Sequence, residues 1–227
     1  MGKEILCDSS ALISITDSCI AHALPFLARK FNISFIITET IEYECVTHPL
    51  SLATKAYAFS ALRIANALQN GTLVKVKSNP EIIAKRDEIL RLTNNIFFSQ
   101  GRPMTLVQAG EAEMLALAND LKIRHLLMDE RTTRLLIEAP FKIKDHFEEE
   151  FHTNVMVNRE NLDKFSDMVR GMQVSRSSEL LALAYENGYF DDYKNLKKDA
   201  YSAALYRLKY AGCGIRYDEL EELAKMA

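Results

Sequence analysis

The stretch that most constrains the fold is KEILCDSS at residues 3–10. A short apolar run ends in Asp8, two serines follow, and a new apolar pattern starts at Ala11. This order is typical of a buried strand that carries a carboxylate at its C-terminal end and leads into a helix. Open α/β sheets bind ligands at that edge. An Asp before a helix can also act only as an N-cap, so this stretch alone leaves both interpretations open.

The same order recurs at residues 124–129, RHLLMD, where an apolar stretch ends in Asp129 and is followed by Glu130. Arg131 and two threonines then open a further helix. Residues 33–37, ISFII, predict another buried strand because they form a continuous run rich in β-branched side chains. If the strands before Asp8 and Asp129 are neighbours in a parallel sheet, these two carboxylates lie side by side.

Two predicted helices add a glutamate each. In TETIEYEC at residues 38–45, Glu44 lies three residues after Ile41 and therefore flanks the buried stripe, whereas Glu42 points more outward. In the helix expected at residues 105–121, Glu111 lies on the same face as buried positions, and Glu113 lies about 200° away from it. Glu44 and Glu111 are therefore the glutamates expected to point toward the two strand ends.

These patterns predict an α/β fold with a central, mainly parallel sheet of about five strands flanked by helices. Residues 1–150 are expected to form the main domain, and residues 151–227 a helical C-terminal extension packed on it. Residues 73–76 predict an edge strand and residues 154–157 a last short strand. Further helices are predicted at residues 9–20, 21–31, 51–68, 80–98, 160–171, 177–187, 192–211 and 217–226.

Composition narrows the functional classes. A net charge of −3 gives no overall signature of nucleic-acid binding, but residues 55–102 carry eight lysines and arginines against three acidic residues. This section is either a phosphate-binding face or a set of solvated helix surfaces. Its candidate contacts for an RNA substrate are Lys55, Arg63, Lys85, Arg86, Arg91 and Arg102.

Cysteine and histidine chemistry has little support. The four cysteines are scattered, with no CxxC pair and no Cys/His cluster of zinc-site spacing, so we expect reduced thiols buried in the core. Seven of the nine tyrosines lie in residues 185–217 and are expected to serve packing or dimerisation. The chain shows no secretory signal pattern and no apolar run of membrane-spanning length, which predicts a cytoplasmic protein without a membrane partner.

Four carboxylates at one edge of a sheet repel one another unless they are protonated or bound to cations. Mg²⁺ and Mn²⁺ prefer oxygen ligands and bridge phosphate oxygens, so such a cluster suits one or two of these ions. Ions of this kind promote hydrolysis of phosphodiesters. A haloacid-dehalogenase-type phosphatase would need a second Asp where Ser10 stands, and the acids of a response-regulator receiver are also absent.

The chain resembles the PIN-domain family of metal-dependent ribonucleases, which includes VapC-like toxins of toxin–antitoxin pairs. The resemblance rests on LCDSSALIS, ITETIEYEC, AGEAEMLALAND and LLMDERTTR, in that order, and on the spacing between Glu111 and Asp129. It is most evident with a PIN subgroup that has a GEAE-type helix and an IDDR-type strand end. The C-terminal ENGYF and LKYAGCGIRYDELEEL extend the resemblance over nearly the whole chain.

The resemblance implies that Asp8, Glu44, Glu111 and Asp129 are the metal ligands and catalytic acids of an endoribonuclease, with Ser10 orienting the first of them. Glu130 stands where the subgroup has a second Asp, so either Asp129 or Glu130 is the last ligand. Family membership would also imply a homodimer and an antitoxin protein as partner. The alternative is a catalytically silent PIN-fold protein that binds RNA or serves as a scaffold.

Overall fold

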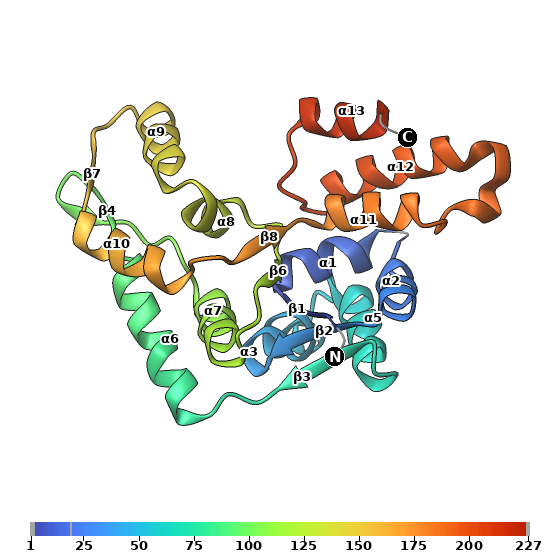
Figure 1. Cartoon of the computed structure of the whole chain (residues 1–227), viewed down its shortest axis with the longest axis horizontal. Coiled ribbons are helices and arrows are strands. Elements are labelled where there is room, and N and C mark those ends of the chain that lie inside the picture. Colours follow the sequence, from blue (N-terminus) through green and yellow to red (C-terminus); the bar gives the residue numbers. More distant parts are fainter. Residues whose placement is uncertain (1–2, 19, 226–227) are drawn as a thin grey trace.

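A five-stranded sheet, parallel throughout, forms the centre of the protein (Figure 1). The structure is a computed structural model and describes residues 3–18 and 20–225. The strand order is β3-β2-β1-β6-β8. The strands are β1 (Lys3–Cys7), β2 (Ile33–Thr38), β3 (Leu73–Val76), β6 (His125–Leu127) and β8 (Gln173–Ser175). The predicted α/β fold with about five mainly parallel strands is therefore confirmed.

The central strand β1 pairs with β2 on one side and with β6 on the other. Leu6 lies opposite both Ile36 and Leu126, and all three side chains are buried. Because β1 and β6 are parallel neighbours, their C-terminal ends meet at the same edge of the sheet. The two stretches that end in carboxylates are thus adjacent, as their common pattern predicts.

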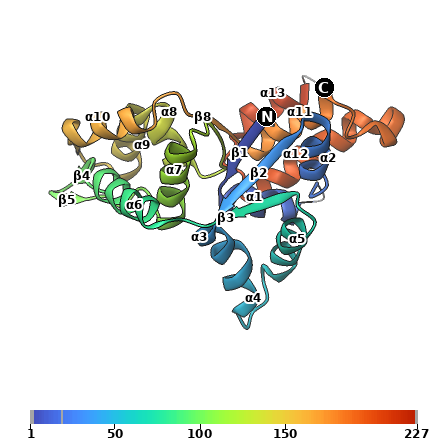
Figure 2. The ribbon, with the colours of Figure 1, turned by 60° about the horizontal axis from the view of Figure 1, so that its bottom comes forward.

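Helices cover both faces of the sheet. Figure 2 shows α7 on one side and α1, α2 and α5 on the other. The helical elements before β6 are α1 (Ser9–Asp17), α2 (Ala23–Phe31), α3 (Glu39–Glu42), the π-helical turn η1 (Tyr43–Thr47), α4 (His48–Ser51), α5 (Ala58–Gln69), α6 (Pro80–Thr93) and α7 (Ala109–Leu121). After β6 follow α8 (Arg131–Glu138), α9 (Pro140–Phe151) and α10 (Arg159–Met168).

Helix α7 is buried on nearly all sides because it packs between the sheet and α6. Glu113, on the side away from Glu111, is only 2% exposed and accepts a hydrogen bond from Ser78 Oγ at 2.5 Å. A helix held between two layers is apolar nearly all round, and the buried residues of α7 agree with this position, since all except Glu111 and Glu113 are small or apolar.

A second, small antiparallel sheet was not predicted. It has the order β5-β4-β7, with β4 (Phe97–Ser99), β5 (Arg102–Pro103) and β7 (Val155–Val157). The helix predicted at residues 80–98 is wrong beyond Thr93, where Asn94 Oδ1 accepts the N–H groups of Leu106 and Val107. The helix predicted at residues 51–68 begins only at Ala58.

The chain after residue 150 contributes two strands as well as helices, because β7 pairs with β4 in the small sheet and β8 completes the edge of the central sheet beside β6. It then forms α11 (Ser177–Glu186), the 3₁₀ turn η2 (Asp191–Leu196), α12 (Lys197–Tyr210) and α13 (Tyr217–Lys225). The rings of Tyr185 and Tyr201 pack between α11 and α12 with centroids 4.3 Å apart. Met226 of the predicted last helix lies outside the described residues.

The described thiols Cys7, Cys45 and Cys213 are free and buried, whereas Cys19 lies outside the described residues. Burial raises the pKa of the Cys213 thiol to about 11, which keeps it protonated at neutral pH. Among the helices in the described part of the chain, none has the length and apolar character needed to cross a membrane.

Candidate functional site

Ser10 joins the ends of the two central strands. Asp8 directly follows β1, and its N–H donates to the Leu127 carbonyl at 2.8 Å, which extends the pairing with β6. Ser10 Oγ donates to Asp8 Oδ2 at 2.5 Å and accepts the N–H groups of Asp129 at 3.1 Å and Glu130 at 3.2 Å. One hydroxyl therefore fixes the position of Asp8 against the chain that leaves β6.

A cavity of about 200 Å³ opens at this edge of the sheet. Four carboxylates line it, and they come from the end of β1, from η1, from the first turn of α7 and from the start of α8. The lining residues are Asp8, Ser9, Ser10, Glu44, Gln108, Glu111 and Glu130. We call this space the acid cavity; its lining contains no lysine or arginine.

Glu44 reaches the acid cavity from the π-helical turn η1. Ser9 Oγ donates to Glu44 Oε2 at 3.0 Å. The carboxylate lies against Gly110 in the first turn of α7, where an added Cβ would stand 2.6 Å from Glu44 Oε1. Real Cβ atoms do not approach oxygen so closely, so Glu44 can lie in this position only because residue 110 is a glycine.

Glu111 is held at the N-terminus of α7 by two donors. Its Oε2 accepts the N–H of Gln108 at 2.7 Å, and its Oε1 accepts Thr133 Oγ1–H at 2.9 Å. The first contact belongs to a capping box, in which an acid three residues into a helix bonds back to the N-cap. The second ties α7 to α8 across the cavity.

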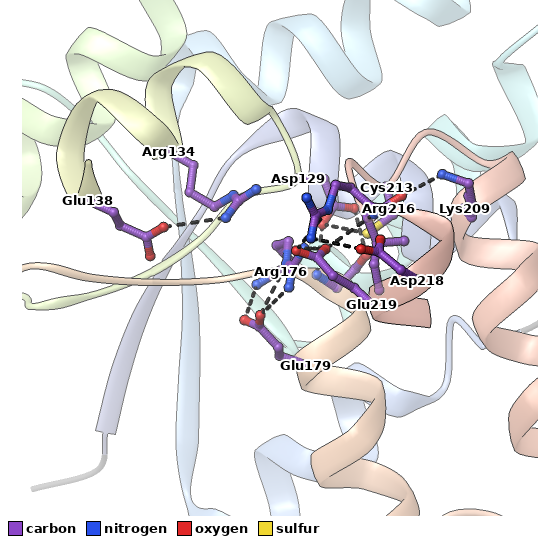
Figure 3. A network of polar contacts seen from close by, with 12 residues as sticks. Asp129, Arg134, Glu138, Arg176, Glu179, Lys209, Cys213, Arg216, Asp218 and Glu219 are labelled. Atoms are coloured by element: carbon purple, nitrogen blue, oxygen red, sulfur yellow. Dashed lines mark hydrogen bonds and ion pairs between the residues drawn. The ribbon is translucent and has the colours of Figure 1, made fainter. Parts of the chain in front are cut away.

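Glu130 also faces the acid cavity and caps α8, accepting the N–H groups of Thr132 at 2.8 Å and Thr133 at 2.6 Å. The Asp129 carboxylate does not line the acid cavity and instead contacts the C-terminal segment. Its Oδ1 accepts the Ser177 N–H at 2.8 Å and its Oδ2 accepts Ser177 Oγ–H at 2.6 Å. The thiol of Cys213 donates to Asp129 Oδ1 at 3.4 Å, so the carboxylate lies within the network of the C-terminal segment (Figure 3).

The structure therefore brings Asp8, Glu44 and Glu111 together around one cavity, with Glu130 as the fourth acid. Asp129 is adjacent in sequence but does not line this space. Its hydrogen-bond partners Ser177 and Cys213 are 48 and 84 residues away along the chain, so no local sequence pattern predicts these contacts.

Burial and mutual repulsion oppose ionisation of the acids. Burial, then Asp8 and also Glu130, raise the pKa of Glu111 to about 8, although hydrogen bonds from Gln108 and Thr133 oppose the rise. The pKa of Asp8 is raised by burial, against the opposing hydrogen bonds from Ser10. Burial also raises the pKa of Glu44, and the charge of Asp8 adds to this. A cation in the cavity would relieve this repulsion.

The donor set suits a hard divalent cation, since it consists of carboxylate, hydroxyl and amide groups without a thiol or imidazole. As they stand, no three His, Cys, Asp or Glu side chains within the described residues are arranged to hold a metal ion. The capping bonds of Glu111 and Glu130 hold these two carboxylates toward helix N-termini. The chemistry therefore fits Mg²⁺ or Mn²⁺, and binding would require the side chains to move closer together.

The basic residues considered from the sequence lie elsewhere. The lining of the acid cavity includes none of these six residues, which are Lys55, Arg63, Lys85, Arg86, Arg91 and Arg102. Arg63 donates to the carbonyl of Thr16 and stacks 4.3 Å over the ring of Phe59, and Arg86 pairs with Asp87 at 2.7 Å. Their assignment to RNA binding stays a prediction.

Several residues that position the carboxylates of the acid cavity were not identified from the sequence. Ser9, Gly110 and Thr133 each contact or make room for a carboxylate of the cavity. The capping-box spacing from Gln108 to Glu111 was a usable signal, because an acid at the third helical position bonds back to the N-cap. The roles of Ser9 and Thr133 depend on contacts between distant segments and had no such signal.

Comparison with protein-family models gives no matching family. Comparison with curated proteins likewise gives no match.

Proposed function

We propose that this protein is a metal-dependent endoribonuclease of the PIN type, which hydrolyses RNA phosphodiester bonds in the cytoplasm, either as the toxin of a toxin–antitoxin pair or as a housekeeping nuclease. The observation that carries the proposal is the acid cavity: Asp8, Glu44, Glu111 and Glu130 surround one space at the carboxyl edge of a parallel sheet. The resemblance of the four sequence motifs to that family supports the substrate class. Asp129 acts in this proposal as a structural residue beside the cavity.

Each acid around the cavity has a proposed role in binding the metal ion. Asp8, at the end of β1 and fixed by Ser10, would be the central ligand because it lines the same cavity as Glu44 and Glu111, and after burial its charge adds to the raised pKa of each. Glu44, Glu111 and Glu130 complete the ligand set from η1, α7 and the start of α8. A bound Mg²⁺ or Mn²⁺ would polarise the attacking water and neutralise charge that develops on the phosphate. Ser10 keeps the backbone of the two strand ends in register during this reaction.

The decisive experiment measures cleavage of single-stranded RNA with Mn²⁺ or Mg²⁺ by the wild type and by Asp8→Asn. We expect Asp8→Asn to lose at least about a hundredfold in rate, since even indirect partners of a metal ligand are worth ten- to a hundredfold. Asp120→Asn is the matched control, because Asp120 is exposed at the end of α7. A wild type that is inert with both metals, or a variant as active as the wild type, would contradict the proposal.

A catalytically silent protein that binds RNA is the alternative outcome of the same assay, and it would show equal RNA binding without cleavage by either protein. We also propose a homodimer, which sedimentation analysis of the full chain tests directly. Association with an antitoxin is a further expectation of the resemblance.

A further inference from the structure

The residue after Glu130 lines a second and larger cavity. This space of about 370 Å³ lies between α8, α9 and the segment that leads into α13. We call it the arginine cavity, because four basic side chains and only two acidic ones line it. These charged residues are Arg131, Arg134, Glu138, Lys142, Arg216 and Glu219.

Both acids of the arginine cavity already have basic partners. Glu138 Oε2 lies 3.4 Å from Arg134, and Glu219 Oε2 accepts a hydrogen bond from Arg176 at 2.7 Å (Figure 3). Arg216 lies 3.6 Å from Glu219, which adds a second positive neighbour. The acids therefore do not neutralise the remaining bases of the cavity.

Arg131 and Lys142 form no ion pair within 4 Å of any described residue. Arg134 adds an unsatisfied donor, because its Nε is buried and has no hydrogen-bond partner in the described part of the chain. A buried donor without a partner destabilises the structure around it. An anion in the cavity would balance the unpaired charges of Arg131 and Lys142, and a small shift of the Arg134 side chain would let its buried Nε donate to that anion.

We propose that the arginine cavity binds a phosphate group within the RNA strand, next to the phosphate that is cleaved in the acid cavity. Guanidinium forks match phosphate oxygens, and lysine adds a point charge, so Arg131, Arg134 and Lys142 form a suitable set. Because Glu130 and Arg131 are consecutive, one strand can enter both cavities. The proposal rests on the ribonuclease function for its choice of RNA as the source of the phosphate.

Binding of a short single-stranded RNA, measured by fluorescence anisotropy, separates this inference from catalysis. The protein is the full chain carrying Asp8→Asn, so that RNA stays intact, and the added change is Arg131→Gln with Arg134→Gln. We expect about tenfold weaker binding. The slope of log affinity against log salt should also become shallower, by about 0.7 for each phosphate that the protein no longer neutralises.

Arg170→Gln is the matched control, since Arg170 is exposed, carries the same charge and pairs with a neighbouring acid on α10, as Arg134 does on α8. Arg134→Lys provides a second variant that keeps the charge and removes the Nε donor, in case the double change disturbs folding. We expect this variant to bind RNA more weakly than the control while its Tm stays close to that of the parent.

RNA affinity and salt slope equal to those of Arg170→Gln would overturn the inference, even if Asp8→Asn abolishes cleavage in the separate nuclease assay. Weaker RNA binding with a wild type that never cleaves would keep the arginine cavity and remove the nuclease function. RNAs with a 5′-phosphate and a 5′-hydroxyl are compared in parallel. A loss confined to the 5′-phosphorylated RNA, or loss of inorganic phosphate binding alone, would identify a terminal or free phosphate and also contradict the inference.

Discussion

Asp8 and Asp129 stand at the ends of neighbouring strands and yet face different surroundings. Asp8 receives hydrogen bonds from Ser10 and faces other acids across the acid cavity. Asp129 receives three donors from Ser177 and Cys213, which belong to the C-terminal segment. At the scale of single residues, similar positions in a sheet therefore give one carboxylate that faces other acids across a cavity and one that is bound to the C-terminal segment.

Asp129→Asn should destabilise the protein by about 1–3 kcal/mol, because an amide replaces one acceptor oxygen with a donor that faces Ser177 Oγ–H or N–H. Urea unfolding in EDTA measures this change in the free energy of unfolding. Asp8→Asn is the matched variant and should be neutral or stabilising under the same conditions, since it removes a buried charge that faces other acids. Equal destabilisation by both variants would contradict the assigned roles.

The raised pKa of Glu111 predicts how stability depends on pH without metal. A carboxyl group with a pKa of about 8 when folded, against 4.5 ordinarily, binds its proton more tightly in the folded state. Its stabilising effect is complete below about pH 4.5 and is lost as the pH rises toward 8. The free energy of unfolding should therefore fall by up to about 1.4 kcal/mol for each pH unit in this range.

Urea unfolding in EDTA at several pH values measures that slope. Glu111→Gln should flatten it, whereas Glu149→Gln, at an exposed position on α9, should leave it unchanged. A wild-type stability that rises between about pH 5 and pH 8 would contradict the raised pKa of Glu111.

At the scale of elements, the acid cavity depends on how closely η1 approaches the first turn of α7. Gly110→Ala tests this contact. Alanine normally stabilises a helix relative to glycine by about 0.5–1 kcal/mol, but here its Cβ would lie 2.6 Å from Glu44 Oε1. We expect a folded protein with Glu44 displaced and metal-dependent cleavage strongly reduced. Full activity in Gly110→Ala would show that this position of Glu44 is not needed.

Strands β1, β2 and β6 could be predicted because a run of apolar residues marks each of them in the sequence. The buried runs of β1, β2 and β6 are continuous and apolar, and each leads to a polar residue at which a helix begins. Strands β4 and β8 lack a comparable buried run, since Phe97 is the one buried residue of β4 and β8 has none. The end of α6 could not be predicted, because the bonds of Asn94 to the chain after β5 are not local.

At the scale of the whole molecule, residues after 150 complete the central sheet as well as adding helices. Strand β8 pairs with β6, and Ser177 at the start of α11 binds Asp129. The candidate site could be predicted as far as Asp8, Glu44 and Glu111, whose positions follow from local strand and helix patterns. The orientation of Asp129 could not, because it is determined by this C-terminal segment.

A chain cut after residue 150 should fail to form a stable fold. It would lose β8, which leaves β6 with an unpaired edge, and it would leave the Asp129 carboxylate buried without its partners. Circular dichroism and thermal unfolding of the 1–150 fragment, compared with the full chain, measure the effect. Cooperative unfolding of the fragment near the Tm of the full chain would instead establish residues 1–150 as an independent domain.

The central claim is that the acid cavity holds a divalent cation for RNA hydrolysis. Anomalous diffraction from crystals soaked in Mn²⁺ tests it most directly. We predict a manganese peak within the acid cavity, contacted by Asp8 and by at least one of Glu44, Glu111 and Glu130. The peak should disappear in Asp8→Asn. Manganese bound only at sites that touch none of these four carboxylates would contradict the account.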